Sequence, residues 1–565
     1  MKLAGLKLVS LLLAAMLVFT GCGDKKNPVM GMDDLKVETN SGTEESATES
    51  TEEGVAESAD GNSGESGDTS AKENEKENEK ENADGNVDKN ADSILTAPAF
   101  TRTERIDNRY TEDGKLLVEG EFRGIEVSGQ GYEAAAKAVR NHFADKEKAF
   151  GESLDLYEES ALDEMQYAVD FRGYSSSVES SVERIDSSVI SIKSFHYDFA
   201  GGVHGNYGSV GATFDTKTGA VLSFWDLAKD KKTFAETTLE SCLTQVSAEC
   251  GDGLYADYEE IIRDVWAEEP NWYLDGTGIT VIFTPYEIGP YAMGEVYVTL
   301  SYQDLADLMK PEYQMGCVSG VAVLTEGAAA AICLEKENSE KESSKKQAVK
   351  IYAENPGAGT VENGFQKILL DVGDKTEYVA ELGRLSGIYL LRREDGRTFL
   401  LFDGDMASDD YITFVYEITD GVIQKVQELP MGTSIRRDGV TLQGVELGIR
   451  VDSLGTYVAY GAYQMTEAGT LESAGEWLTI EPMYESQILT VVRELPVLVN
   501  GSKSVLPAGS RLQIIGTNGK DILRYRTVDD AREGEIHYTR GENGWPVYID
   551  GVSETEYFDD LPYAG

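Results

Sequence analysis

The chain alternates between two patterns of apolar and polar positions, one that repeats every second residue and one with helical spacing. Leu116 to Glu126 alternates apolar and polar positions, which predicts a strand, and residues 178–199 predict one or two more strands. Residues 131–150 instead place apolar side chains at helical spacing. They predict a helix with one buried stripe made of Tyr132, Ala136, Val139 and Phe143.

Helices and strands continue to mix as far as residue 334. The sequence predicts, in order, two amphipathic helices, two strands, a short helix and an apolar hairpin over residues 234–246, 255–266, 281–283, 296–300, 302–309 and 315–334. This mixture of separate helices and strands predicts an α+β domain from about residue 98 to about residue 310.

Beyond residue 348 the pattern becomes almost entirely β. Runs such as ITFVYEITDGVIQKV contain short strands joined by Asp-Gly, a dipeptide that favours tight hairpin turns. The polar run over residues 336–347 predicts a linker in front of this part. About 470 residues follow the N-terminal segments, which is too many for one core and favours about three domains.

The first 22 residues predict an export signal that ends in a lipidation site. Lys2 and Lys7 precede an apolar run that is too short to span a bilayer. Thr20-Gly21-Cys22 resembles the cleavage box of bacterial lipoproteins, which implies cleavage before Cys22 and diacylation of its sulfur. An ordinary secretory signal with an incidental cysteine is the alternative. A lipid anchor would hold the protein on the outer face of the cell membrane.

Residues 23–97 predict a disordered acidic linker. From Met32 to Asp92 the chain has twenty acidic and five basic residues, a net charge of −15, and almost no large apolar side chains. Such a segment cannot bury enough surface to offset the entropy lost by ordering its backbone. We therefore expect a spacer between the lipid surface and a folded head.

Most of the negative charge belongs to that folded head, because the whole chain has a formal charge of −51. A balance this acidic excludes DNA and RNA as partners, and it excludes anionic lipid surfaces, since all three need a basic surface. It favours a basic partner, whose association it would accelerate at low salt. An acidic surface also keeps an exported protein soluble, and this simpler reason accounts for much of the charge.

Five cysteines are present, of which Cys22 is the predicted lipidation site. Cys242 and Cys250 lie in or beside a predicted helix, where eight residues rise about 12 Å, so they cannot bond to each other unless the helix breaks. The pairs Cys250–Cys317 and Cys317–Cys333 and a set of four free thiols all stay open. The sequence has no Cys-x-x-Cys pair, so we expect neither a zinc ribbon nor a thioredoxin-like site.

Two segments carry a resemblance to a known family. The first, from His196 to Leu227, is HYDFAGGVHGNYGSVGATFDTKTGAVLSFWDL. The second, from Asn271 to Leu300, is NWYLDGTGITVIFTPYEIGPYAMGEVYVTL. Together they resemble the extracytoplasmic domain of RsiV-type anti-sigma factors, whose best-known members recognise lysozyme. The resemblance implies an RsiV-like domain over residues 195–335 that binds another molecule and is not an enzyme.

The preceding residues, 98–194, resemble the N-terminal module of the PdaC peptidoglycan deacetylase. The catalytic domain of that enzyme holds its metal with a Thr-Phe-Asp-Asp-Gly motif and a His-x-x-x-His pair. Here Thr213-Phe214-Asp215 is followed by Thr216 and Lys217, and no His pair has that spacing. We therefore do not expect deacetylation, and we predict that Asp215 accepts backbone donors in a hairpin turn.

The C-terminal residues 486–565 resemble a bacterial SH3-like barrel, best over Leu506-Pro-Ala-Gly509 and the following Leu512 to Ile515. Residues 348–485 resemble no family and predict a β-rich domain. The predicted fold class is thus an α+β RsiV/PdaC-like N-terminal head, followed by all-β domains that end in an SH3-like barrel.

Catalytic groups are sparse. The chain has four histidines, His142, His196, His204 and His537, and no Gly-x-Ser-x-Gly elbow lies near any of them. His196 and His204 flank a Gly-Gly turn, so a two-histidine metal site across a hairpin is one interpretation. In the favoured interpretation, His196 packs on a strand and His204 donates a hydrogen bond that fixes its own turn. We expect neither a metal nor a cofactor.

The segment from Pro285 to Tyr291 predicts a contact surface. Two prolines fix its backbone, and two tyrosines offer a large contact area with a polar tip. The predicted ligand-binding residues are Pro285, Tyr286, Pro290 and Tyr291. The alternative is that this segment packs a corner of the fold, and this alternative is favoured for Glu287 and Ile288.

The sequence thus predicts a non-enzymatic, lipid-anchored cell-surface protein that binds a cell-wall-associated protein or glycan. A basic lysozyme-type enzyme is the sharpest candidate partner. We find no sigma-binding segment or membrane helix of the RsiV kind, so direct transcriptional signalling is not expected. Two alternatives stay open: a peptidoglycan-binding scaffold that acts through the SH3-like barrel, and a wall-modifying enzyme with its site in residues 348–485.

Overall fold

The computed structural model describes residues 97–168, 171–333, 346–354, 365–406, 410–419, 421–481 and 487–564. The predicted signal, Cys22, and the predicted acidic linker apart from its last residue lie outside the described residues, as does most of the predicted linker at 336–347. Ser93–Gly565 forms one compact unit. None of the described helices is both long enough and apolar enough to cross a membrane.

A mixed sheet opens the fold. Its first strands are β1 (Ala99–Ile106), β2 (Arg109–Tyr110), β3 (Leu116–Ser128), β4 (Tyr174–Asp186), β5 (Val189–Phe199) and β6 (Asn206–Asp215). β3 and β4 pair in parallel, as strands joined by a long helical crossover do, and β4, β5 and β6 form an antiparallel meander. The predicted strands at 116–126 and 178–199 are confirmed, the second as two strands.

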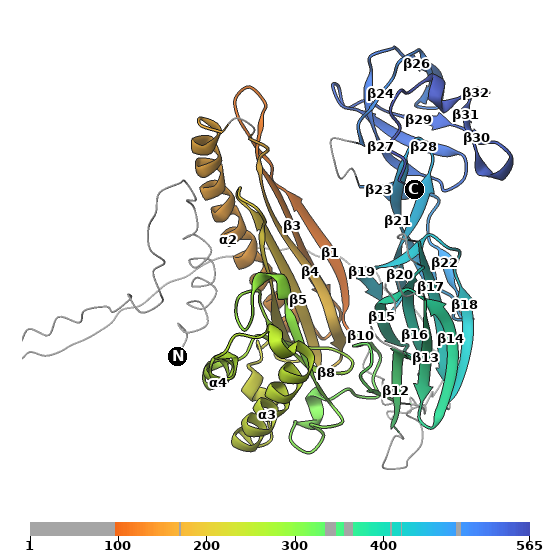
Figure 1. The fold of residues 1–565 in the computed structure, drawn as a ribbon. Coiled ribbons are helices and arrows are strands. Elements are labelled where there is room, and N and C mark those ends of the chain that lie inside the picture. Colours follow the sequence, from red (N-terminus) through yellow and green to blue (C-terminus); the bar gives the residue numbers. More distant parts are fainter. Residues whose placement is uncertain are drawn as a thin grey trace, which may run out of the picture. The chain divides into compact units, whose positions relative to one another are not determined.

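Helix α2 (Glu133–Met165) runs beside β3, β4 and β5 (Figure 1). Its apolar side chains recur every three or four residues, so they form one stripe along the helix. The buried members of that stripe are Ala135, Val139, Phe143, Phe150, Leu154 and Ala161. The predicted helix is confirmed, but it continues well past residue 150. Tyr132 is buried as predicted, although it precedes the helix as its N-cap residue, and Ala136 is only partly buried.

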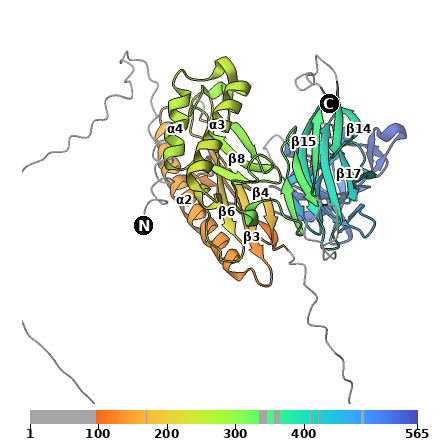
Figure 2. The same ribbon diagram turned by 90° about the horizontal axis from the view of Figure 1, so that it is seen from below.

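A second group of elements consists of α3 (Lys231–Cys250), α4 (Tyr258–Glu268) and a small antiparallel sheet of β7 (Trp272–Leu274), β8 (Gly278–Phe283) and β9 (Val296–Ser301). The Asp230 side chain caps α3 by accepting from the backbone N–H of Thr233 at 2.9 Å. Figure 2 shows α2, α3 and α4 gathered in the same half of the ribbon as β3, β4, β6 and β8. The predicted helices and strands of this region are confirmed.

Residues 302–309 do not form the predicted helix and instead follow a series of turns. Their C-terminal end is fixed by backbone bonds to an adjacent segment, from Lys229 N–H to Leu308 O and from Lys310 N–H to Leu227 O, both 2.8 Å. Eight residues form too short a helix to be stable on their own. Tertiary contacts therefore decide the conformation of this segment.

The predicted apolar hairpin over residues 315–334 is also wrong. Its two strands, β10 (Gly320–Val323) and β11 (Ala330–Cys333), do not pair with each other. β10 pairs instead with β4 on one side and with β15 (Arg384–Arg392) on the other. The close fit requires glycine at position 320, where a Cβ would lie 2.6 Å from the carbonyl oxygen of Ile185. One sheet therefore continues from the α+β part into the β-rich part.

The β-rich part consists of antiparallel pairs, as predicted. Its remaining strands before residue 485 are β12 (Lys346–Ala353), β13 (Gln366–Val372), β14 (Lys375–Leu382), β16 (Thr398–Asp405), β17 (Tyr411–Thr419), β18 (Val422–Glu428), β19 (Thr433–Thr441), β20 (Gly444–Asp452), β21 (Thr456–Met465), β22 (Leu471–Ser473) and β23 (Leu478–Ile480). One apolar core includes Phe283, Leu324, Val349 and Leu400, so it spans both sides of the predicted linker.

The C-terminal residues form short strands, β24 (Leu489–Thr490), β25 (Leu495–Val499), β26 (Ser502–Leu506), β27 (Arg511–Thr517), β28 (Ile522–Thr527), β29 (Glu533–His537), β30 (Thr539–Arg540), β31 (Val547–Ile549) and β32 (Val552–Ser553). Neighbouring strands follow the open order β23-β27-β28-β29-β25-β26, and no closed barrel forms within residues 487–564. The all-β class is thus confirmed, and closure into a barrel is not.

The cysteines resolve part of the pairing question. Cys242 and Cys250 are free thiols on α3, and burial raises the pKa of Cys242 to about 12, which makes it unreactive. Cys317 is disulfide-bonded. The pair Cys250–Cys317 and the set of four free thiols were therefore wrong. The pair Cys317–Cys333 stays a prediction, because the side chain of Cys333 is outside the described part.

Candidate functional site

The two segments that carry the family resemblance meet in one cluster of aromatic side chains. The first segment contributes the turn over residues 200–205 between β5 and β6, and the second contributes the loop over 284–295 between β8 and β9. Tyr291 stacks on His204 with ring centroids 3.9 Å apart and an interplanar angle of 19°. Its hydroxyl donates to the carbonyl oxygen of Gly205 at 2.7 Å, a contact between residues 86 positions apart in sequence. We call His204, Tyr207, Tyr286 and Tyr291 the aromatic patch.

Glycine makes the first turn possible. Gly201 and Gly202 have φ values of +83° and +89°, a region that favours glycine because other residues are strained there. Tyr197 and Tyr207 face each other across the hairpin. A Cβ at Gly205 would lie 2.5 Å from the Tyr197 ring, so the ring can cover the chain only because this residue is glycine.

His204 lies in the same turn and is exposed. Its Nδ1 lies 2.9 Å from the carbonyl oxygen of Gly205, which confirms that it makes a hydrogen bond within its turn. The stacking on Tyr291 was not predicted. The sequence did contain a signal for the paired tyrosines, because HYDFAGGVHGNY places Tyr197 and Tyr207 on the two sides of the turn.

The second loop divides into residues that hold it and residues that face solvent. The Glu287 carboxylate accepts from the N–H of Thr284 at 2.8 Å, Ile288 is buried in the core, and burial raises the pKa of Glu287. These two residues pack the fold, as the alternative interpretation proposed. Tyr286 is 54% exposed, and Pro290 is exposed as well. Pro285 is half-buried.

Tyr286 also has a strained backbone, with a φ of +72° that is uncommon for a residue with a side chain. Such a conformation persists only where surrounding contacts enforce it, and it is found mainly at functional sites. The ring of Tyr286 lies 5.5 Å from that of Tyr291, centroid to centroid, and Tyr207 meets Tyr291 edge-on at the same distance. Three tyrosine rings and one imidazole thus form a single surface of fixed geometry.

A network of charged groups begins at Glu295, the last residue of the loop over 284–295, and its members pair with one another. Glu295 accepts from the backbone N–H and the hydroxyl of Ser209 and from the Tyr297 hydroxyl. Lys193 lies over the Tyr297 ring at 5.3 Å and 3.9 Å from Glu183, and burial lowers its pKa. Since each charge has a partner inside the fold, we interpret this network as support for the patch.

Two buried carboxyl groups with raised pKa values are equally structural. Burial raises the pKa of Asp275 to about 6 and that of Asp403 to about 7. Asp275 accepts from Thr277, Gly278 and Thr280, and Asp403 accepts from Thr413 and from the N–H of Ile435. Within the described residues, no group of three or more His, Cys, Asp or Glu side chains is placed to hold a metal ion.

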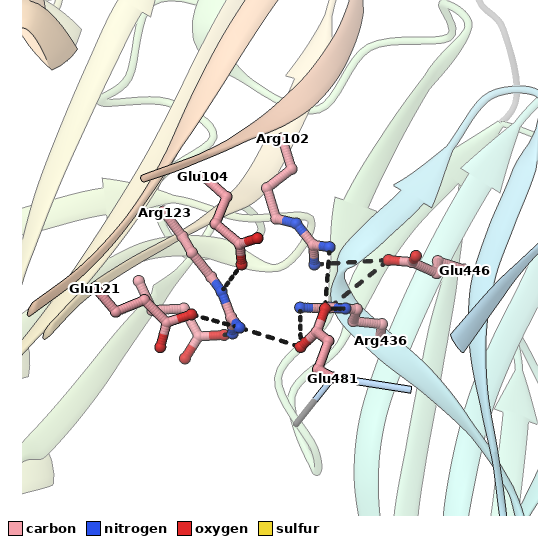
Figure 3. A network of polar contacts seen from close by, with 8 residues as sticks. Arg102, Glu104, Glu121, Arg123, Arg436, Glu446 and Glu481 are labelled. Carbon is pink, nitrogen blue, oxygen red and sulfur yellow. Dashed lines mark hydrogen bonds and ion pairs between the residues drawn. The ribbon is translucent and has the colours of Figure 1, made fainter. Parts of the chain in front are cut away.

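A second cluster of charges joins the outer strands of the first sheet to the C-terminal half (Figure 3). The Glu481 carboxylate lies 2.9 Å from Arg436, 3.1 Å from Arg123 and 3.7 Å from Arg102. Burial raises the pKa of Glu481, but the arginines lower it by more, so the net shift is downward. Arg123 also contacts Glu104 and Glu121 at 3.0 and 2.6 Å. The cluster therefore fastens strands together and does not form an open ligand site.

His196 and His204 do not share a site. His196 pairs with Val178 and Gly208 within the sheet, and its Nε2 is buried, whereas His204 is exposed on the aromatic patch. Asp215 caps its turn as predicted, with Oδ1 accepting from the backbone N–H groups of Lys217 and Thr218 at 3.1 and 2.8 Å.

Comparison with known proteins gives a family for part of the chain. Residues 229–303 match the family model described as "Protein of unknown function (DUF3298)", so the chain carries a DUF3298, RsiV-like domain. The match runs from just before α3 to just after β9. It includes the loop over 284–295 and does not include the turn over 200–205, which contributes the other half of the aromatic patch.

Two solved structures of DUF3298 family proteins resemble the chain. The one from Bacteroides fragilis is 18% identical with a TM-score of 0.32 and covers 39% of this chain and 96% of its own. The one from Pseudomonas aeruginosa is 18% identical with a TM-score of 0.26 and covers 40% of this chain and 99% of its own. No curated protein matches the chain.

Proposed function

We propose that this protein is a non-enzymatic, lipid-anchored cell-surface protein whose RsiV-like domain binds a cell-wall-associated partner through the aromatic patch. A basic lysozyme-type enzyme is the sharpest candidate for that partner. The aromatic patch is the observation that carries the proposal. Two distant segments bring four aromatic side chains together at the surface, and one of these, Tyr286, is exposed on a strained backbone.

Physical chemistry supports a binding role for such a surface. Tyrosine rings offer a large contact area and lose little conformational entropy on binding, so residues of this kind dominate the energetics of many interfaces. The formal charge of −51 attracts a basic partner over a distance of about 10 Å at moderate salt. Charge would therefore set mainly the association rate, and the rings would set mainly the dissociation rate.

The Tyr286→Ala variant tests the patch directly. Because Tyr286 is mostly exposed, we expect no loss of thermal stability, whereas binding to a lysozyme-type protein should weaken by about 1–3 kcal/mol, mainly through faster dissociation. Surface plasmon resonance at low salt and thermal unfolding of the same samples would measure both effects. Tyr378→Ala is a matched control, because Tyr378 is also 54% exposed but lies on β14.

The outcome separates three cases. Equal weakening in both variants would show that general surface properties, and not the patch, govern binding. No binding of the wild-type protein at low salt would reject a lysozyme-type partner. Retention of the protein on purified peptidoglycan, unchanged by Tyr286→Ala, would favour the scaffold alternative.

That scaffold alternative has one specific observation in its favour. In the C-terminal part, which resembles an SH3-like barrel, Trp545 is 46% exposed and its ring centroid lies 4.7 Å from that of Tyr563. An exposed tryptophan beside a second ring is a suitable surface for a cell-wall ligand. Loss of peptidoglycan retention in Trp545→Ala would support this function.

Membrane anchoring through Cys22 has its own test. If the sulfur of Cys22 is acylated, Cys22→Ala should leave the signal uncut or release the protein from the membrane, because the anchor depends on buried CH₂ groups at about 0.8 kcal/mol each. Membrane fractionation and the intact mass of the protein measure this. An unchanged membrane fraction together with an unchanged mass would rule out lipidation at this residue.

A further inference from the structure

Two half-buried histidines lie between α2 and the sheet that it covers. His142 belongs to α2 and meets the Phe214 ring of β6 edge-on, with centroids 5.5 Å apart. His196 belongs to β5 and pairs with residues of β4 and β6. Both side chains keep some exposed surface, but the Nε2 atom of each is shielded from solvent and has no hydrogen-bond partner.

A third basic group completes this cluster. Lys146 follows His142 by four residues, which is one turn along the helix. Burial and then the charge of Lys146 lower the pKa of His142 to about 3, and the same two causes together with His142 lower that of His196 to about 3. Burial also lowers the pKa of Lys146 to about 8. The charges that act on the two imidazoles are therefore all positive.

Asp198, the next carboxyl group along β5, offers little compensation for the positive charges near the two imidazoles. Asp198 accepts from the Ser176 hydroxyl of β4 at 2.6 Å and is hydrogen-bonded to Tyr157 of α2, and burial raises its pKa. It is not hydrogen-bonded to the Nε2 atom of either imidazole, because both of these atoms are unpaired. A proton added to either ring would place an N–H group at Nε2 with no acceptor and a positive charge near Lys146.

We propose that the interface between α2 and the sheet is an acid-sensitive element, in which protonation of His142 and His196 releases the helix from the sheet. The closed interface holds both imidazoles neutral, whereas an open interface exposes them to water. Protonation of the two imidazoles therefore favours the open form, and Asp198 on β5 is the carboxyl group that acts against it. The inference stands independently of the proposed binding function.

The direction and the size of the pH effect on opening follow from the linkage between proton binding and opening. In the closed form the pKa values of both histidines lie below the ordinary 6.5. Their contribution to the stability of the closed form is therefore complete above about pH 6.5 and is lost as the pH falls below it. From pH 7 to pH 5, each imidazole should increase the opening equilibrium constant by up to about 25-fold. The raised pKa of Asp198 acts in the opposite direction, so the comparison must be between variants at each pH.

Hydrogen exchange of the α2 amides in the full chain tests the proposal. After correction for intrinsic rates, we expect wild-type opening to increase at least about 10-fold from pH 7 to pH 5. The His142→Phe/His196→Phe variant should lose most of that increase. His537→Gln should behave like the wild type, because His537 is exposed on β29 beside Glu535 at 3.3 Å.

Three results would overturn the proposal: no acid-induced opening in the wild type, an equal increase in the double variant, or an increase that His537→Gln removes. If the double variant does not fold, NMR titration of the wild-type imidazoles decides the matter. The His142 and His196 rings should stay neutral from pH 7.5 down to pH 5, and titration of both near the ordinary value of 6.5 would contradict the inference.

Discussion

Replacement of Arg184 by methionine is expected to lower the free energy of unfolding by about 3–5 kcal/mol. Arg184 is 1% exposed and uses all five of its N–H donors. Two of them bind Asp186, at 2.8 and 2.7 Å. The other three bind the Tyr302 hydroxyl and the carbonyl oxygens of Tyr313 and Gln314, at 2.7, 2.7 and 3.1 Å.

The large effect comes from the partners that the substitution leaves behind. Arg184→Met would remove the counter-charge of the buried Asp186 carboxylate, which would keep only the N–H groups of Ser188 and Val189. It would also leave the carbonyl oxygens of Tyr313 and Gln314 without this donor, and the loss of such partners from buried groups costs free energy. It would also release the segment after β9 from β4. Urea denaturation followed by circular dichroism measures the loss.

Arg140→Gln is the matched control, since Arg140 is 62% exposed and lies 3.2 Å from Glu126, which is 50% exposed. An exposed ion pair contributes little, so this variant should change stability by less than about 1 kcal/mol. The double variant Arg184→Met/Asp186→Asn should recover part of the loss, because it removes the unpaired buried charge. Similar denaturation midpoints for Arg184→Met and Arg140→Gln would show that the buried arginine is not structural.

Replacement of Gly211 by alanine is expected to destabilise the protein by about 3 kcal/mol, at the upper end of the cost of overpacking a core. A Cβ at this position would lie 1.8 Å from the carbonyl oxygen of Trp272, so the backbones of β6 and β7 would have to separate. The same junction is held by Asn271, whose side chain accepts from Gly211 N–H at 3.0 Å and donates to Ser209 O at 2.7 Å.

Gly208→Ala on the same strand is the control, because its Cβ would meet only the side chain of Thr284, whose methyl group would lie 3.1 Å away. A side chain can move by a few tenths of an ångström where a backbone carbonyl cannot, so this variant should be much less affected. Thermal unfolding of both variants is the measurement. A melting temperature of Gly211→Ala equal to that of Gly208→Ala would mean that β6 and β7 are not in close contact.

Local periodicity was enough to predict the helices α2, α3 and α4, several strands of the α+β part and the β-rich character of the rest. The stripe on α2 and the alternation in β3 are properties of contiguous residues, so the sequence displays them directly. The errors fell where distant partners decide the structure. Nothing near Gly320 in sequence indicates that β10 will insert between β4 and β15, and the turns at 302–309 depend on bonds to Leu227 and Lys229.

The candidate site also has a part that contiguous residues determine and a part that distant residues determine. The composition of the loop from Pro285 to Tyr291 was sufficient to predict an aromatic surface with two packed residues within it. The contribution of His204 could not be predicted in this way, because the stacked pair His204–Tyr291 joins two hairpins that are close only in the folded chain. Likewise, the shielded Nε2 atoms of His142 and His196 depend on how α2 lies on the sheet.

The two-part construction of the aromatic patch has a consequence for how the protein can vary among its relatives. His204 and Tyr291 lie on separate hairpins, yet each ring is the other's packing surface, so a change in one alters the fitness of changes in the other. We expect these two positions, and Gly205 with Tyr197, to be inherited as matched pairs. A gene fragment limited to residues 229–303 would carry one member of the first pair and neither member of the second, and transplanting it to another protein would not transfer the surface.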